Sequence, residues 1–212
     1  LNLDAGKKAK TSTAYEHALK YVTTGMQLLD EHSWQTHYDL TGELSKERAE
    51  CEYLCGNFSE AENLFDLILK RLKTNKEKVA VYSKKITLYT NQGRFKDAID
   101  LGREGLRLYG IVLPVKPGKG IILLEYLKSK YLRYQKKWHG MKTINDLSRL
   151  PDMSDPDKLS AMSILKHLPD PAYFLDTNML VLLSIKMVNL SLKYGNTDVS
   201  PFAYSLYGTV LA

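Results

Sequence analysis

Cysteine is nearly absent from this chain, whose 212 residues include two, Cys51 and Cys55. Both fall on one expected helix, and a bridge between positions four apart in a regular helix fits poorly with disulfide geometry. So little cysteine, with no apolar signal-peptide core at the N-terminus, is typical of a reducing compartment, so we expect a cytoplasmic protein. A zinc site would need two more ligands, and no CxxC or HExxH spacing supplies them, so we predict no metal ligands.

Long apolar runs and strand-like stretches are missing as well. No segment approaches the roughly 18–20 apolar residues of a membrane-spanning helix. Thirteen glycines, seven prolines and few runs of β-branched residues argue against an all-β fold. Leucine is abundant, with 34 residues, and 25% of the chain is charged. With its 3.6-residue periodicity, this composition predicts an all-α fold.

An internal repeat predicts the architecture. The pattern Gly-x-Phe-x-acid-Ala occurs at 56–61 and again at 93–98, an offset of 37 residues. Each copy separates two stretches with helical periodicity, namely 45–55 from 59–72 and 76–91 from 95–109. This spacing is typical of tetratricopeptide-like helical hairpins, whose period is about 34 residues. A weaker third copy at 14–19 resembles a second helix whose first helix we expect to be mostly missing, and we expect the next helix to extend over 34–50.

The pattern becomes less regular after residue 108. We expect a loop near 110–118, and then a series of helices separated by prolines, at 121–138, 144–150, from Asp155 or Asp157 to His167, at 178–194, and from a Ser200 cap onward. The predicted fold is therefore an all-α, tetratricopeptide-like helical-hairpin array, an α-solenoid. Residues 1–110 form its regular part, and 111–212 continue the same superhelix less regularly.

Sequence patterns for catalysis or cofactor binding are missing. The string Gly118-Lys119-Gly120 resembles part of a phosphate-binding loop, but Leu113 stands where the first glycine belongs and Gly120 where a hydroxyl residue belongs. His17 and His167 lack the surroundings of a phosphotransfer histidine. Four acids on one expected helix are predicted mostly to face solvent, namely Glu43, Glu47, Glu50 and Glu52. We therefore predict no catalytic or cofactor-binding residues and no enzyme activity for this segment.

The excess positive charge lies on one element. Residues 114–140 contain seven basic residues and one acid, Glu125. On the helix expected at 121–138, one apolar stripe is predicted to pack, formed by Leu124, Leu127, Tyr131, Tyr134 and Trp138. The basic residues then form the predicted partner-binding surface, Lys128, Lys130, Arg133, Lys136 and Lys137. This surface is interpreted either as a docking site for an acidic partner, nucleic acid or anionic lipid, or as a solvated face, with a nucleic-acid-binding helical array as the alternative function.

The helix expected at 178–194 is apolar on nearly all faces. Such a helix lines a ligand pocket or forms the core, and the core is the commoner case.

Several strings together carry a family resemblance. They are Ser33-Trp34-Gln35, Tyr38-Asp39-Leu40, Tyr53-Leu54-x-Gly56-Asn57-Phe58, Gly110-Ile111-x-Leu113-Pro114 and, most specific, Lys186-Met187-Val188-Asn189-Leu190-Ser191-Leu192-x-Tyr194-Gly195-Asn196. The chain resembles the helical region of large bacterial and fungal signalling proteins that combine a serine/threonine-kinase-like domain, an AAA/STAND-type ATPase, GAF domains and a sensor histidine kinase.

The resemblance implies a non-catalytic scaffold or sensor region within a signal-transduction ATPase and kinase of the two-component type. Its implied partners are neighbouring domains of the same chain or another protein. The chain starts at Leu1 and ends inside an apolar pattern, so we expect it to be a segment of a larger protein.

Overall fold

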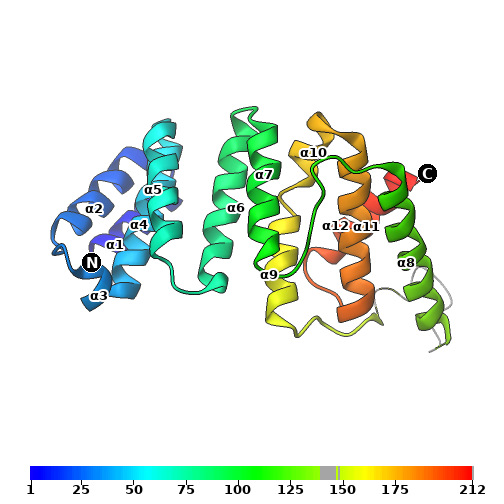
Figure 1. Ribbon diagram of the computed structural model, residues 1–212. Helices are drawn as coiled ribbons and strands as arrows, with labels where there is room; N and C mark the ends of the chain where they lie inside the picture. Colours follow the sequence, from blue (N-terminus) through cyan, green and yellow to red (C-terminus); the bar gives the residue numbers. More distant parts are fainter. Residues whose placement is uncertain (139–146, 148, 212) are drawn as a thin grey trace. The chain divides into compact units, whose positions relative to one another are not determined.

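The structure is a computed structural model that describes residues 1–138, 147 and 149–211, without the side chains of 136–138 and 211. Over these residues the chain forms helices packed as sequential antiparallel hairpins, and no strand, which confirms the all-α prediction (Figure 1). The described helices are α1 (Asn2–Thr11), α2 (Tyr15–Gln27), α3 (Ser33–Thr36), α4 (Tyr38–Leu54), α5 (Phe58–Arg71), α6 (Asn75–Asn91), α7 (Phe95–Arg107), α8 (Lys119–Trp138), α9 (Pro156–Leu165), α10 (Pro169–Leu175), α11 (Thr177–Tyr194) and α12 (Ser200–Leu211).

The chain divides into two compact units, Leu1–Leu88 and Tyr89–Ala212. The division falls within α6, whereas the regular hairpins were predicted to extend to about residue 110, and that predicted limit stays a prediction. The first unit is built from the hairpins α1–α2 and α4–α5, with α2 also packed on α4. Its core contains Ala18, Val22, Leu44 and Cys51.

The turns inside the hairpins share one backbone geometry. Gly56 and Gly93 have φ of +84° and +72°, a left-handed conformation that glycine adopts without steric cost. In each turn, the N–H of the following residue donates to the carbonyl of the residue five positions earlier, at 2.9 Å. Thr13, at φ +60°, makes the same turn between α1 and α2. The weak third copy is therefore a full hairpin, and the prediction that its first helix is mostly missing was wrong.

Other boundaries differ from the prediction for local reasons. The helix expected over 34–50 is broken at His37, where φ is −132°, so that α3 and α4 are separate. The proline-rich segment after Leu168 forms α10, because proline is compatible with the first turn of a helix. Asp155, one of the two starts that the sequence left open for this helix, caps α9 by accepting from the N–H groups of Asp157 and Lys158. The helix expected at 144–150 lies largely outside the described residues.

Helix α11 is the centre of the second unit. Helices α8, α9, α10 and α12 all pack on it, and α7 packs on α9 and α10. Eleven of its eighteen residues are buried, which confirms the prediction that this helix forms the core. It ends at Gly195, with φ +108° and ψ 173°, and the next residue, Asn196, forms an isolated bridge with Asp152. Ser200 was predicted to cap the last helix. Its hydroxyl instead shares a hydrogen bond of 2.8 Å with the hydroxyl of Ser191 and accepts from the N–H of Thr197.

Candidate functional site

Helix α8 packs on α11 and has a mixed buried side, on which Ser129 and Leu132 are buried and Glu125 is half-buried. The opposing surface of α11 is also polar at this point. The Nζ of Lys186 lies 2.7 Å from Oε1 of Glu125, and the Nδ2 of Asn189 donates to Oε2 at 3.0 Å. Polar groups therefore meet polar groups across this helix pair, and the hydrogen bonds offset the cost of their burial.

The apolar stripe of α8 points away from α11. Leu124 is 68% exposed, Tyr131 60% and Tyr134 62%, and Leu127 is exposed as well. The prediction that this stripe packs against the protein was wrong, because Lys186 and Asn189 of α11 pair with Glu125, which lies on the opposite side of α8 from the stripe. Trp138, the fifth member of the predicted stripe, has a side chain outside the described residues.

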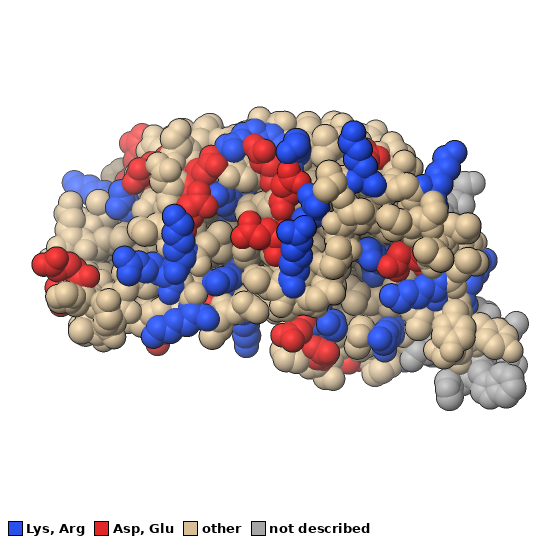
Figure 2. All heavy atoms as spheres, in the orientation of Figure 1, with Lys and Arg blue, Asp and Glu red and all other residues tan. Residues whose placement is uncertain are grey.

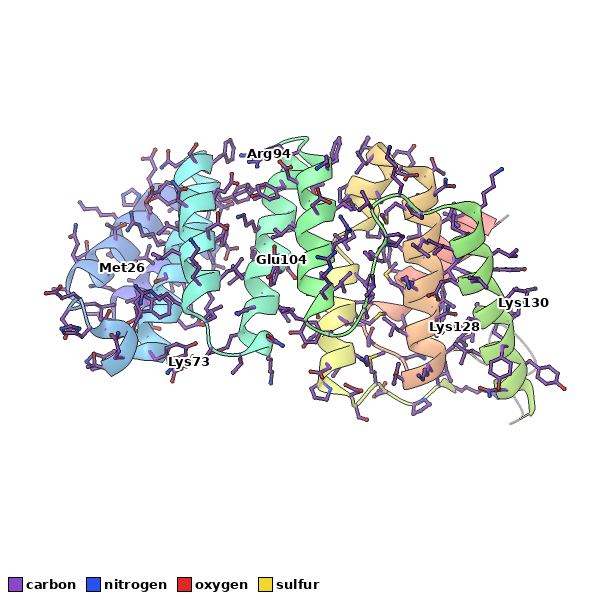
Figure 3. All side chains as sticks on the ribbon, viewed as in Figure 1. Met26, Lys73, Arg94, Glu104, Lys128 and Lys130 are labelled. Atoms are coloured by element: carbon purple, nitrogen blue, oxygen red, sulfur yellow. The ribbon has the colours of Figure 1, made fainter. Side chains whose placement is uncertain are left out.

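The predicted basic surface does not lie on one side of α8. Successive residues of an α-helix are rotated by about 100°, so Lys128 and Lys130 point in nearly opposite directions. Figure 3 shows Lys128 on the side of α8 toward α11 and Lys130 on the side away from it. Lys130 borders one edge of the apolar stripe and Lys128 the other, whereas Arg133, which is also exposed, is about 100° away from the stripe residue Tyr134. The side chains of Lys136 and Lys137 lie outside the described residues.

A pocket of about 350 Å³ lies where α8, α9, α11 and the loop after α7 come together within the second unit. It contains four lysines and one carboxylate. The lining residues are Gly110, Ile111, Val112, Glu125, Lys128, Lys158, Lys186, Asn189, Leu190, Lys193 and Tyr194. The sequence did not predict this pocket, although it raised a ligand pocket as the alternative for the helix that became α11.

The charges around this pocket are only partly balanced. Burial acts to raise the pKa of Glu125, but the hydrogen bond and charge of Lys186, with Lys128 and Asn189, outweigh it and lower the pKa. The Nζ of Lys128 is 3.7 Å from Oε2 of Glu125. Lys158 and Lys193 have no carboxylate partner among the described residues. On the face in Figure 2, blue predominates over red where α8 and α11 lie.

Two further contacts fix the pocket's edge. The Nζ of Lys158 donates to the carbonyl of Tyr109 at 3.4 Å. The ring centroid of Tyr194 is 5.7 Å from the Nζ of Lys158 and 4.9 Å from the Nζ of Lys193. An aromatic face attracts ammonium groups, so Tyr194 holds both lysines beside the opening.

Asn189 in the pocket wall has an unmet hydrogen-bonding capacity. Its side chain donates to the carboxylate and to the main-chain carbonyl of Glu125, at 3.0 and 3.1 Å. The residue is 4% exposed, and its Oδ1 has no hydrogen-bond partner in the described part of the chain. Both Nδ2 partners are acceptors, so turning the amide over would break two bonds. A buried acceptor without a donor costs about 1–3 kcal/mol.

The described residues show no disulfide, no group of possible metal ligands and no membrane-spanning helix. Cys51 and Cys55 are free, and burial raises the pKa of Cys51 to about 11. Among the described residues, no three His, Cys, Asp or Glu side chains cluster as metal ligands would. None of the described helices has the length and apolar character to span a membrane.

The sequence predicted that the acids of α4 mostly face solvent, and this was wrong. Several of them pair with lysines of other helices. Lys10 lies 2.6 Å from Glu47 and 3.0 Å from Glu50, and Lys84 lies 2.6 Å from Glu50. Lys7 and Lys46 both contact Glu43. Glu52 is buried and accepts a hydrogen bond from Asn57 at 2.7 Å. These carboxylates therefore connect helices.

One curated protein is related to the chain over its full length. Across 237 aligned residues the chain is 25% identical to the hybrid signal transduction histidine kinase G of Dictyostelium discoideum. The match covers 100% of the chain and 7% of the relative. The chain thus corresponds to a small region of a much longer signalling protein. The relative's organism is neither a bacterium nor a fungus, the two groups that the resemblance named. No family model and no solved structure matches the chain.

Proposed function

We propose that this chain is a non-catalytic helical contact region of a multidomain signalling protein that includes a histidine kinase. The exposed apolar stripe of α8 carries the proposal. The distant match to a hybrid histidine kinase supports the signalling context. The kinase-like and ATPase domains that the resemblance implies belong to the proposal, and they would lie outside these residues.

The chemistry of the α8 surface favours a protein partner. Its centre consists of leucine and tyrosine side chains, of which Leu124, Leu127 and Tyr131 are at least half exposed. Contiguous exposed apolar surface with a polar rim is typical of interaction sites. The flanking Lys128 and Lys130 favour acidic residues at the rim of the partner. Nucleic acid remains the alternative, but exposed leucines gain nothing from contact with phosphates.

We propose that the occupant of this surface is another domain of the same protein. A domain of the same chain is present at a high effective concentration, so a small contact area suffices for docking. The relative extends far beyond the matched region, which is 7% of its length, so a domain of the same protein is available as the occupant if this chain also belongs to a longer protein.

A photo-crosslinking experiment tests this function. A benzophenone amino acid would replace Leu127 in the protein as its gene encodes it, and cross-linked peptides would be identified by mass spectrometry. We expect cross-links from position 127 to another segment of the same protein, with acidic residues near the attachment point. Leu28 is a matched control, because it is 76% exposed and lies in the first unit.

The outcomes separate the hypotheses. Cross-links from position 127 that are no more frequent than those from position 28 contradict a docking surface on α8. Cross-links to RNA or DNA support the nucleic-acid alternative instead. Enzyme activity of the purified 212-residue chain, such as ATP hydrolysis lost in Lys119→Ala, would contradict the non-catalytic role.

A further inference from the structure

We infer that the lysine-lined pocket of the second unit binds a small phosphate monoester. The pocket and the apolar stripe of α8 use different residues, so this inference does not rest on the proposed function. Glu125 and Lys128 line the pocket, whereas Leu127 and Tyr131 belong to the exposed stripe, which Lys128 borders without being part of it.

The charge balance of the pocket selects an anion. Four ammonium groups surround one carboxylate, that of Glu125, and Lys186 already pairs with it at 2.7 Å. Lys158 and Lys193 remain without a carboxylate in the described residues, and Lys128 is 3.7 Å from an oxygen that Asn189 also contacts. An anion between these lysines would relieve their mutual repulsion. Ammonium groups act as point charges toward phosphate, and a dianion gains more from several of them than a carboxylate does.

The origin of the lysines favours a bound ligand over simple solvation. Lys158 comes from α9, Lys128 from α8, and Lys186 and Lys193 from α11. Tyr194 holds Lys158 and Lys193 beside the opening through its ring. Because three helices contribute lysines to one pocket, a single anion there can contact several ammonium groups at once.

The size and wall of the pocket fit a small organic phosphate, and its lysines form the anion site. The volume of about 350 Å³ is within the range of about 300–1,000 Å³ for small-molecule sites. Leu190 and Ile111 give the wall an apolar component against which a carbon skeleton can pack.

Calorimetric titration of the 212-residue chain at low ionic strength tests the inference, with ribose 5-phosphate as the probe. Lys158→Gln and Lys193→Gln should each raise its Kd about tenfold, which corresponds to ~1.4 kcal/mol. Lys166→Gln is the matched control, because Lys166 is an exposed lysine just after α9 and outside the pocket. Circular dichroism would establish that all three variants are folded.

Two matched probes test the phosphate requirement. Ribose lacks the phosphate and should not bind measurably. Ethyl phosphate keeps the phosphate without the sugar and should still bind. No heat with ribose 5-phosphate, or a Kd unchanged in both lysine variants, overturns the site. Binding of ribose as tight as that of ribose 5-phosphate overturns the phosphate requirement.

These outcomes are independent of α8 docking. Cross-linking at position 127 can fail while ribose 5-phosphate binds, and binding can fail while cross-links form. A variant at Lys158 or Lys193 leaves the stripe of α8 unchanged.

Discussion

The two units use charge differently. The first has 13 basic and 13 acidic residues, and its lysines pair with carboxylates across helices, as Lys10 does with Glu47 and Glu50. The second has 17 basic and 11 acidic residues, and its lysines gather around a pocket with one carboxylate. In the first unit, ion pairs join helices. In the second unit, some of the positive charge has no carboxylate partner among the described residues and is available to an external anion.

The units also differ in how their helices are joined. Hairpins of the first unit repeat one turn with a left-handed residue, Thr13 or Gly56, and neighbouring helices pack in sequence. In the second unit four helices surround α11, and a main-chain bridge joins Asp152 to Asn196. A change at one position should therefore have a local effect in the first unit and a larger one in the second.

The largest expected effect is that of Gly195→Ala, compared with Gly56→Ala. Gly195 has a φ and ψ that only glycine adopts readily, and a Cβ there would clash with the carbonyl oxygen of Pro151 and lie 2.9 Å from the N of Met153. We expect a loss of about 3 kcal/mol in the free energy of unfolding. Gly56 has no atom within 4 Å of its Cβ position, so the loss should be about 1 kcal/mol.

Urea unfolding of both variants measures this difference. Equal losses at the two positions would show that the backbone beside Gly195 accommodates a Cβ atom at no greater cost than an exposed turn does. The contrast between a sequential and a centred arrangement would then be wrong.

The next effect tests the repeat itself, in both units. Ala61 in α5 and Ala98 in α7 occupy the same position of the repeat and are fully buried. Replacing either by Leu should cost about 1–3 kcal/mol through overpacking. Ala80→Leu is the control, because Ala80 is exposed on α6. Losses at 61 and 98 no larger than at 80, measured by urea unfolding, would contradict the assigned register.

The sequence predicted the fold where local rules decide it. Gly56 and Gly93 set the turns, and Asp155 sets the start of α9, because these effects act within a few residues. The hairpin of α1 and α2 was underestimated because Thr13 replaces the glycine of the other copies. A β-branched residue in the left-handed region is rare, so the pattern gave no reason to expect a complete turn there.

The candidate site was harder to predict, because periodicity identifies residues that share a face without showing which face meets a neighbour. Leu124 and Tyr131 do share a face of α8, but that face is exposed. One signal for the pocket was present. Lys186, Asn189 and Lys193 recur at i, i+3 and i+7 in an otherwise apolar helix, which puts three polar groups on one side of it. Lys158 comes from a distant segment and had no such signal.

A smaller effect separates paired from unpaired charge in the first unit. Lys10→Met should lower the free energy of unfolding at pH 7 by about 1 kcal/mol, because Glu47 and Glu50 lose their shared partner. Lys20→Met, at an exposed position without an ion pair in the described residues, should change little. Equal losses in the two variants would mean that the pairing with α4 contributes nothing measurable.

The same pairs give a dependence on pH. Burial acts to raise the pKa of Glu50, but Lys84 and Lys10 outweigh it, and the bond from Lys46 chiefly lowers the pKa of Glu43. Both folded pKa values lie below the ordinary 4.5, so the stability they contribute is present above that pH and lost as the pH falls through them. The difference between Lys10→Met and the unmodified chain should therefore shrink below pH 4.5.

The smallest expected effect is at the exposed edge of α8. Lys130→Gln combined with Arg133→Gln should leave the urea midpoint unchanged, because both side chains are exposed and surface charges outside a network contribute about 0–1 kcal/mol. The same double variant should weaken docking of an acidic domain, most strongly at low salt, since attraction between exposed charges is screened over about 10 Å at 0.1 M. Cross-linking from position 127 at two salt concentrations measures that loss. A clearly lowered unfolding midpoint would show that these two residues stabilise the second unit, and a salt-independent cross-link would show that docking depends on the apolar stripe alone.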